Sequence, residues 1–203
     1  DISIKKFTKS DFELPEDAFV FCSFNSNYKI TPYIFNIWMN ILKKVPNSIL
    51  WILVSNSDAK KNPKLEAKQS GVNENRIIFA KKIPVNEHLK RMQIADLFLD
   101  TFPCNAHTTA SEAIRMALPI ITISGESFAS RVAKSILNQV NLNGLVVSNE
   151  KDYQNLAIDL ANNKSKLEEI KSNLRKSLKN TSLYNSKEFT KNLEDIYTGL
   201  INK

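Results

Sequence analysis

Three consecutive polar residues, His107, Thr108 and Thr109, stand where a short predicted helix begins, and Asn105 lies just before them. The first turn of a helix leaves backbone N–H groups unpaired and carries the positive end of the helix dipole. Small hydroxyl side chains there can therefore surround a phosphate group. Threonine also caps helices for structural reasons alone. From these residues by themselves the plain cap is the favoured interpretation, and a phosphate site is the competing one.

This helix is predicted to connect two buried strands, at residues 96–100 and 119–124. Strand, helix and strand in this order make a βαβ unit with a right-handed crossover and parallel strands. Ligands of such sheets bind at the carboxyl ends of the strands. The loop that carries Asn105 and His107 lies at that end, so these polar residues are expected at the binding edge of the sheet.

Apolar periodicity and turn residues divide the rest of the chain into alternating strands and helices. Further strands are predicted at residues 18–24, 48–54, 76–80 and 144–147. Helices are predicted at residues 31–45, 60–70, 86–94 (with Asn86 as its cap), 127–140, 150–161, 164–179 and 186–201. The pattern predicts a doubly wound α/β fold with a mostly parallel, six-stranded, Rossmann-like sheet and a helical C-terminal extension.

Residues 1–17 form a polar lead that is typical of a linker from an upstream region, and their abrupt start indicates a fragment. Residues 18–203 are then expected to form one domain, because a chain of this length can bury a sizeable core. Apolar side chains of the last helix either face a missing partner lobe, which leaves them exposed here, or cover an edge of the sheet. These side chains are Phe189, Leu193, Ile196, Tyr197 and Leu200.

The formal net charge of +7 comes mostly from lysines that are spread along the chain. It indicates a solvated basic surface and no nucleic-acid partner, because no recognition helix or aromatic-rich basic strand accompanies it. The two cysteines, Cys22 and Cys104, have no metal-binding spacing and favour a reduced, cytoplasmic setting. Cys104 lies near His107 and could act as a nucleophile, but a small buried thiol is the favoured role. No segment resembles a signal peptide or a membrane span, so a soluble protein is expected.

Several nucleotide-binding classes are excluded by what the loops lack. The chain has four glycines and contains neither a G-x-G-x-x-G fingerprint nor a Walker motif, which excludes dinucleotide oxidoreductases and P-loop NTPases. A response-regulator receiver needs acidic residues after the first strand, where this chain has Asn25, Ser26 and Asn27. A nucleotide would have to be bound by another kind of loop.

A series of segments, in the same order along the chain, forms a specific pattern. They are L-P-E-D-A-F-V-F-C-S-F-N-S-N-Y-K-I at 14–30, W-x-x-I-L-K-x-V-P-N-S-I-L-W at 38–51, N-R-I-I-F at 75–79, E-H-x-x-R at 87–91, A-D-x-x-L-D-T at 95–101, C-N-A-H-T-T at 104–109 and G-E-S-F-A-S-R-V at 125–132. With these segments almost the whole chain resembles the C-terminal catalytic lobe of the O-linked N-acetylglucosamine transferases. These are two-lobed GT-B enzymes, some of the SPINDLY type, that add a sugar to protein Ser/Thr and usually carry tetratricopeptide repeats upstream.

The resemblance implies a role for each matching residue. In the family the Lys of the Y-K-I motif contacts the diphosphate of the UDP-sugar, which implies the same for Lys29. A cation there neutralises the charge that grows on the leaving UDP, so Lys29 is expected to be catalytic and to matter more for turnover than for binding. His107, Thr108 and Thr109 are implied to bind the phosphates, which reverses the preference for a plain cap. Glu112 replaces the family's Asp that binds the ribose hydroxyls.

The nucleoside contacts follow from the E-H-x-x-R segment, which places His88 near the uridine and Arg91 near the uracil edge. Without the resemblance, a capping or surface histidine and a solvated arginine are the favoured interpretations. Two positions depart from the family. Ser26 stands where the family often has a Gln that contacts the donor, and Val85 replaces a Lys beside the ribose. We therefore expect weakened rather than abolished UDP binding, with Ser26 still at the donor site.

The implied reaction is the inverting transfer of a sugar, N-acetylglucosamine by resemblance, from UDP to the Ser or Thr hydroxyl of an acceptor protein. No cofactor or metal is expected, since no D-x-D motif occurs, and Asp96 and Asp100 beside a buried strand are interpreted as structural. The family's N-terminal catalytic lobe and tetratricopeptide repeats are missing from this chain. The chain alone is therefore expected to be the donor-binding half, without full catalytic competence.

Two other functions stay open. One is a GT-B transferase with another acceptor, such as a protein Asn or a glycan, which product analysis would distinguish. The other is a non-catalytic interaction module that keeps the fold after losing activity.

Overall fold

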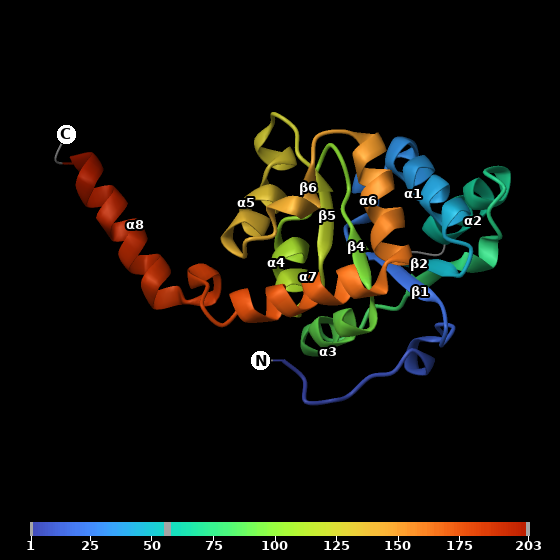
Figure 1. Ribbon diagram of the computed structural model, residues 1–203, viewed down its shortest axis with the longest axis horizontal. Helices are drawn as coiled ribbons and strands as arrows, with labels where there is room; N and C mark the ends of the chain where they lie inside the picture. The colour runs from blue at the N-terminus through green and yellow to red at the C-terminus, as the bar shows by residue number, and fades with distance from the viewer. Residues whose placement is uncertain (1, 55–57, 202–203) are drawn as a thin grey trace.

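The centre of the computed structural model, which describes residues 2–54 and 58–201, is a six-stranded sheet (Figure 1). Its strands are β1 Phe19–Ser23, β2 Ser48–Leu53, β3 Ile77–Ala80, β4 Leu97–Leu99, β5 Ile120–Ile123 and β6 Val146–Val147. Their order is β3-β2-β1-β4-β5-β6 and every neighbouring pair is parallel, so the predicted doubly wound fold is confirmed. Residue 1 of the predicted linker, and residues 55–57 and 202–203 of the predicted lobe, lie outside the described residues.

Helices cover both faces of this sheet. The helices of the described residues are α1 Pro32–Lys44, α2 Asp58–Gln69, α3 Val85–Arg91, α4 Thr108–Arg115, α5 Val132–Gln139, α6 Glu150–Asn162, α7 Lys164–Ser177 and α8 Ser186–Ile201, of which α8 lies apart from the sheet. Right-handed crossovers place α1 and α2 on one face and α3, α4 and α5 on the other, because the strand order reverses after β3. The packing agrees, since α6 returns to α1 while α4 packs against α5. Large side chains such as Trp38 and Phe98 are fully buried between the layers.

The start of α3 differs from the prediction. The helix begins at Val85, with Pro84 in the N-cap position and no side-chain cap, so the predicted cap at Asn86 is wrong. Proline carries no N–H and has a fixed φ, and it therefore starts this helix without help from a capping side chain. The end of the predicted helix is a separate 3-10 turn, η4 Met92–Ile94. Two other predicted elements also begin with such a turn: η5 Phe128–Ser130 precedes α5, and η6 Asn143–Leu145 precedes β6.

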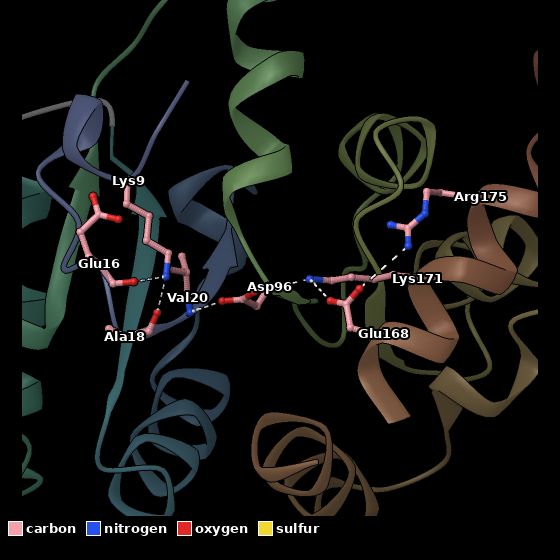
Figure 2. Close-up of polar contacts among 8 residues, drawn as sticks. All are labelled: Lys9, Glu16, Ala18, Val20, Asp96, Glu168, Lys171 and Arg175. Atoms are coloured by element: carbon pink, nitrogen blue, oxygen red, sulfur yellow. Dashed lines mark hydrogen bonds and ion pairs between the residues drawn. The ribbon is translucent and has the colours of Figure 1, made fainter. Parts of the chain in front are cut away.

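The residues before β1 pack on the sheet. Figure 2 shows Lys9 Nζ donating to the carbonyl oxygens of Glu16 at 2.7 Å and of Ala18 at 2.8 Å. The Phe12 ring lies 5.0 Å from the Trp51 ring of β2. The segment that leads into β1 is thereby fixed against β1 and β2.

Asp96 ties three elements together at the same end of the sheet (Figure 2). It precedes β4, accepts a 2.8 Å hydrogen bond from the Val20 N–H of β1, and pairs with Lys171 of α7 at 3.4 Å. Glu168 in turn lies 3.7 Å from Lys171 and 3.9 Å from Arg175. The predicted structural role of Asp96 is confirmed, at the edge opposite to the predicted binding edge.

Helix α8 points away from the rest of the molecule and buries none of its residues (Figure 1). Its apolar side chains are exposed: Phe189 62%, Leu193 37%, Ile196 60%, Tyr197 58% and Leu200 63%. The interpretation that they cover the sheet's own edge is therefore wrong, and their exposure is what the other interpretation predicts. Along the described ranges, no helix is both long and apolar enough to cross a bilayer.

Candidate functional site

Two neighbouring loops carry most of the predicted site residues. The loop after β1 holds Ser26 and the 3-10 turn η2 Asn27–Lys29, and the loop after β4 leads to His107 and α4. The strands β1 and β4 pair with each other at the point where the strand order reverses. This switch point is where doubly wound sheets bind ligands, because the loops on its two sides diverge and leave a crevice.

A hydrogen bond joins the two loops. Lys29 Nζ donates to the carbonyl oxygen of Asn105 at 2.7 Å, although 76 residues separate them in the chain. Lys29 is partly exposed, whereas Asn105 is fully buried. The structure thus brings the ammonium group of Lys29 to the corner where α4 begins.

The start of α4 has no conventional cap. His107 occupies the N-cap position with φ −110° and ψ −90°, and its side chain makes no capping hydrogen bond. Thr108 and Thr109 are inside the helix, with Thr108 exposed and Thr109 partly exposed. The plain capping role is therefore wrong for both threonines. The N–H groups of the first turn, which a helix cannot satisfy internally, are left for solvent or for an anion.

A third loop, after β5, packs against this corner. The carbonyl oxygen of Ala129 accepts a 2.9 Å bond from the Asn105 N–H and lies 3.4 Å from His107 Nε2. The Phe128 ring meets the imidazole of His107 edge-on, with 6.0 Å between the ring centres. Gly125 N–H donates to the Ser130 carbonyl oxygen at 3.0 Å and closes the loop. The sequence marked this segment only through the family resemblance.

Asp100, directly after β4, connects the loops after β1 and β4 and the strand β5 through buried hydrogen bonds. Its Oδ1 accepts from the N–H groups of Thr101 at 2.8 Å and Ala106 at 2.7 Å and from Asn25 Nδ2 at 3.2 Å, and its Oδ2 accepts from Thr122 Oγ1 at 2.7 Å. Burial raises its pKa to about 6, although these donors act in the opposite direction. The residue is therefore mostly a carboxylate at neutral pH. Its predicted structural role is confirmed, and the sequence signal was an acid directly after an apolar strand.

Arg91 is buried, so the solvated arginine that the sequence favours without the family resemblance is wrong. Its exposed fraction is 1%, and its guanidinium carbon lies 5.2 Å from the centre of the Phe24 ring and 5.7 Å from that of the Trp51 ring. Its Nη1 donates to the Lys81 carbonyl oxygen at 2.6 Å and its Nε to His88 Nδ1 at 2.9 Å. A direct contact between Arg91 and a nucleoside would require this side chain to move.

His88 is held by Arg91 in one tautomer. Because Nδ1 accepts the hydrogen bond from Arg91, the proton of the neutral ring lies on Nε2, which can donate to a ligand. Burial, followed by the nearby positive charge of Arg91, lowers the His88 pKa to about 4. The ring centre lies 5.3 Å from that of Phe24, which ends the β1 segment. His88 is therefore a neutral donor at the same edge of the sheet as Lys29.

The low pKa of His88 makes a prediction about pH. The unfolded chain takes up a proton near the ordinary pKa of 6.5 and the folded chain only near 4, so His88 lowers the stability as the pH falls below about 6.5. Urea unfolding of the wild type should lose about 1 kcal/mol more between about pH 7.5 and pH 5 than unfolding of His88→Gln, after allowance for part exposure. Equal losses would show that His88 titrates normally.

Four other predicted positions lie at the same edge in different states of exposure. Glu112 is half-buried one turn into α4, and burial raises the pKa of its carboxyl group. Ser26 is exposed, and Val85 at the start of α3 is 69% exposed. Cys104 is partly exposed and free, so its predicted burial is only partial, whereas Cys22 is buried.

Ser26 and Thr108 are exposed, so the site is open to solvent at these positions. A hollow of about 600 Å³ lies beside it, at the carboxyl ends of β5 and β6. It is lined by Ser124, Gly125, Glu126, Lys134, Val146, Val147, Ser148 and Asp152. Within residues 2–54 and 58–201, no group of three or more His, Cys, Asp or Glu side chains could hold a metal ion. What this edge of the sheet does offer is the ammonium group of Lys29 beside the free N–H groups of α4, together with the neutral imidazole of His88, a set that suits a phosphorylated ligand.

Known proteins are similar to this chain in both sequence and fold. The profile of Glycosyl transferase family 41 matches residues 2–193. The chain is 40% identical over 190 residues to "Probable UDP-N-acetylglucosamine--peptide N-acetylglucosaminyltransferase SEC" of Arabidopsis thaliana, covering 93% of this chain and 19% of that protein. It is 32% identical to the UDP-N-acetylglucosamine--peptide N-acetylglucosaminyltransferase of Caenorhabditis elegans, covering 96% of this chain and 17% of that one. A mutant O-GlcNAc transferase of Thermobaculum terrenum superposes with a TM-score of 0.85 at 27% identity, over 89% of this chain and 35% of that chain.

Proposed function

Because the chain belongs to glycosyl transferase family 41, we propose that it is the UDP-sugar-binding lobe of an enzyme that transfers N-acetylglucosamine from UDP to protein Ser or Thr. The observation that carries the proposal is the 2.7 Å hydrogen bond from Lys29 Nζ to the Asn105 carbonyl oxygen, which sets a cation beside the start of α4. A cation next to free helix N–H groups suits a diphosphate. The names of these two relatives support the donor and the sugar.

In this proposal the donor lies across the carboxyl ends of β1 and β4. The diphosphate binds Lys29 and the first turn of α4 at residues 107–109, and the ribose hydroxyls donate to the carboxylate of Glu112. His88 Nε2–H donates to a uracil carbonyl group, while Arg91 holds the imidazole from behind. Ser26 is exposed beside Lys29 and can contribute one short contact.

The proposed reaction inverts the anomeric carbon. The acceptor oxygen forms a bond to that carbon as the bond to the UDP oxygen breaks, and negative charge grows on the leaving diphosphate. Lys29 and the N–H groups of α4 stabilise this charge, and the proposal includes no metal or cofactor. The chain spans 19% of its Arabidopsis relative, and the proposal assigns the surface that binds the acceptor protein, and the group that takes the hydroxyl proton, to the rest of the enzyme. We also propose a cytoplasmic location, since both cysteines are free.

Calorimetric titration of this chain with UDP tests the donor site without the rest of the enzyme. We expect saturable binding below the millimolar range, and UDP should bind at least about tenfold more tightly than ADP, because ADP shares the diphosphate but not the base. Absence of heat with millimolar UDP would contradict the proposal. Equal binding of UDP and ADP would contradict the assignment of the uridine contact to His88.

A further inference from the structure

Asp100 lies at the centre of a buried polar cluster that the proposed reaction does not use. We propose that Asp100 is a positioning residue for the donor site, which holds the Asn105 carbonyl group and the start of α4 where Lys29 and a diphosphate need them. The inference rests on the proposed function and concerns a residue that does not touch the donor itself. Only 1% of its surface is exposed.

One side of the Lys29–Asn105 bond is fixed through the backbone after β4. Asp100 Oδ1 accepts the N–H of Ala106 at 2.7 Å, one residue after Asn105. The Asn105 side chain donates from Nδ2 to the carbonyl oxygen of Thr101, whose own N–H donates to Asp100 Oδ1. Asn105 is thus held on both sides, and its carbonyl group keeps one direction.

The other side of the bond is fixed through the loop after β1. Asn25 Nδ2 donates to Asp100 Oδ1 at 3.2 Å and to Thr101 Oγ1 at 2.8 Å. Asn25 precedes Lys29 by four residues, in the loop that closes with the turn η2. A single carboxylate therefore connects both partners of the bond that carries the proposed function.

Two polar atoms of this cluster are left without partners. The Oδ1 atoms of Asn25 and Asn105 are buried and accept no hydrogen bond from any described residue. Each such atom costs about 1–3 kcal/mol of desolvation. Unsatisfied buried polar groups are expected where function fixes the geometry.

Asp96, at the other end of β4, provides a matched comparison for Asp100. It lies before β4, as Asp100 lies after it, and it also accepts a backbone N–H from another segment, that of Val20. Its ion pair with Lys171 is at the edge away from the donor site. Removing Asp96 should therefore lower the stability of the fold without changing the geometry around Lys29 and the start of α4.

The test is UDP titration of the full chain with Asp100→Ala, Asp100→Asn and Asp96→Ala, each with its unfolding curve. Asp100→Ala should weaken UDP binding at least about tenfold, because two backbone N–H groups lose their acceptor. Asp100→Asn keeps that acceptor and should stay within about threefold of the wild type. Asp96→Ala should stay within about twofold while it loses stability. In the double variant with Lys29→Ala and Asp100→Ala, UDP affinity should fall by clearly less than the product of the two single losses. Both changes break the same connection between Lys29 and Asn105.

Equal weakening by Asp96→Ala and Asp100→Ala, in proportion to lost stability, would overturn the inference. If Asp100→Ala does not fold, Asn25→Ala should weaken UDP binding about fivefold, and an unchanged affinity would overturn it. If the wild type binds no UDP, the proposed function fails separately. Positioning is then tested by hydrogen exchange, since the Ala106 N–H should exchange at least about tenfold faster in Asn25→Ala than in Asp96→Ala. Equal exchange in both would overturn it.

Discussion

Lys29→Ala is expected to lower the rate of sugar transfer by about two orders of magnitude, in an enzyme that contains this lobe together with the rest of a family 41 protein. The ammonium group lies at the start of α4, held by the Asn105 carbonyl oxygen at 2.7 Å. Charge on the UDP oxygen develops only as the sugar leaves, so the cation stabilises the transition state more than the bound donor. UDP affinity should therefore fall only about threefold, measured by calorimetry beside a transfer assay.

Lys43→Ala is the matched control for charge. Lys43 is exposed in the last turn of α1, at the amino end of the sheet, and its replacement by Ala removes the same charge from the protein. It should leave transfer and UDP affinity unchanged. If Lys29→Ala also left both unchanged, the chain would be better described as a non-catalytic interaction module.

Gly125→Ala should lower the free energy of unfolding by about 2 kcal/mol and weaken UDP binding with it. A Cβ at this position would lie 2.6 Å from Ser130 Oγ, 3.0 Å from Ser130 Cβ and 3.2 Å from the Phe102 ring. Ser130 is buried, so the loop after β5 has to shift. That shift moves the Ala129 carbonyl group, which accepts from the Asn105 N–H and lies next to His107. Urea unfolding and UDP titration measure the two effects.

Gly144→Ala serves as the control for glycine replacement. A Cβ at Gly144 has no neighbour within 4 Å, so its unfolding free energy should change by less than about 0.5 kcal/mol. Equal stability of the two variants would mean that the loop after β5 adapts without cost. The loop would then not hold Asn105 and His107 in a fixed position.

The fold was largely predictable because its physical signals are strong. A nearly continuous apolar run such as β2 Ser48–Leu53 has few stable places other than the middle of a parallel sheet. The amphipathic helix α1 Pro32–Lys44 carries its start signal in Thr31 and Pro32. The start of α3 was missed, because Asn86 is a common cap and the helix instead follows Pro84. Local preference cannot decide between two cap positions that lie two residues apart.

The candidate site was predictable in its chemistry but not in its supports. The helix start at His107 can be inferred from the order of strand, loop and helix. The hydrogen bond of Lys29 to Asn105 cannot, because the two residues are 76 positions apart and the family resemblance relates their segments only through a shared ligand. The burial of Arg91 was missed for the same kind of reason. Its aromatic neighbours Phe24 and Trp51 lie directly after β1 and within β2, far from Arg91 in the sequence.

A crystal structure of this chain with bound UDP would show whether Lys29 and the start of α4 form the donor site. The diphosphate should lie at the first turn of α4, within hydrogen-bond distance of Lys29 Nζ and of residues 107–109, with the base next to His88. Density for UDP at another edge of the sheet, or a diphosphate that Lys29 does not reach, would contradict this assignment.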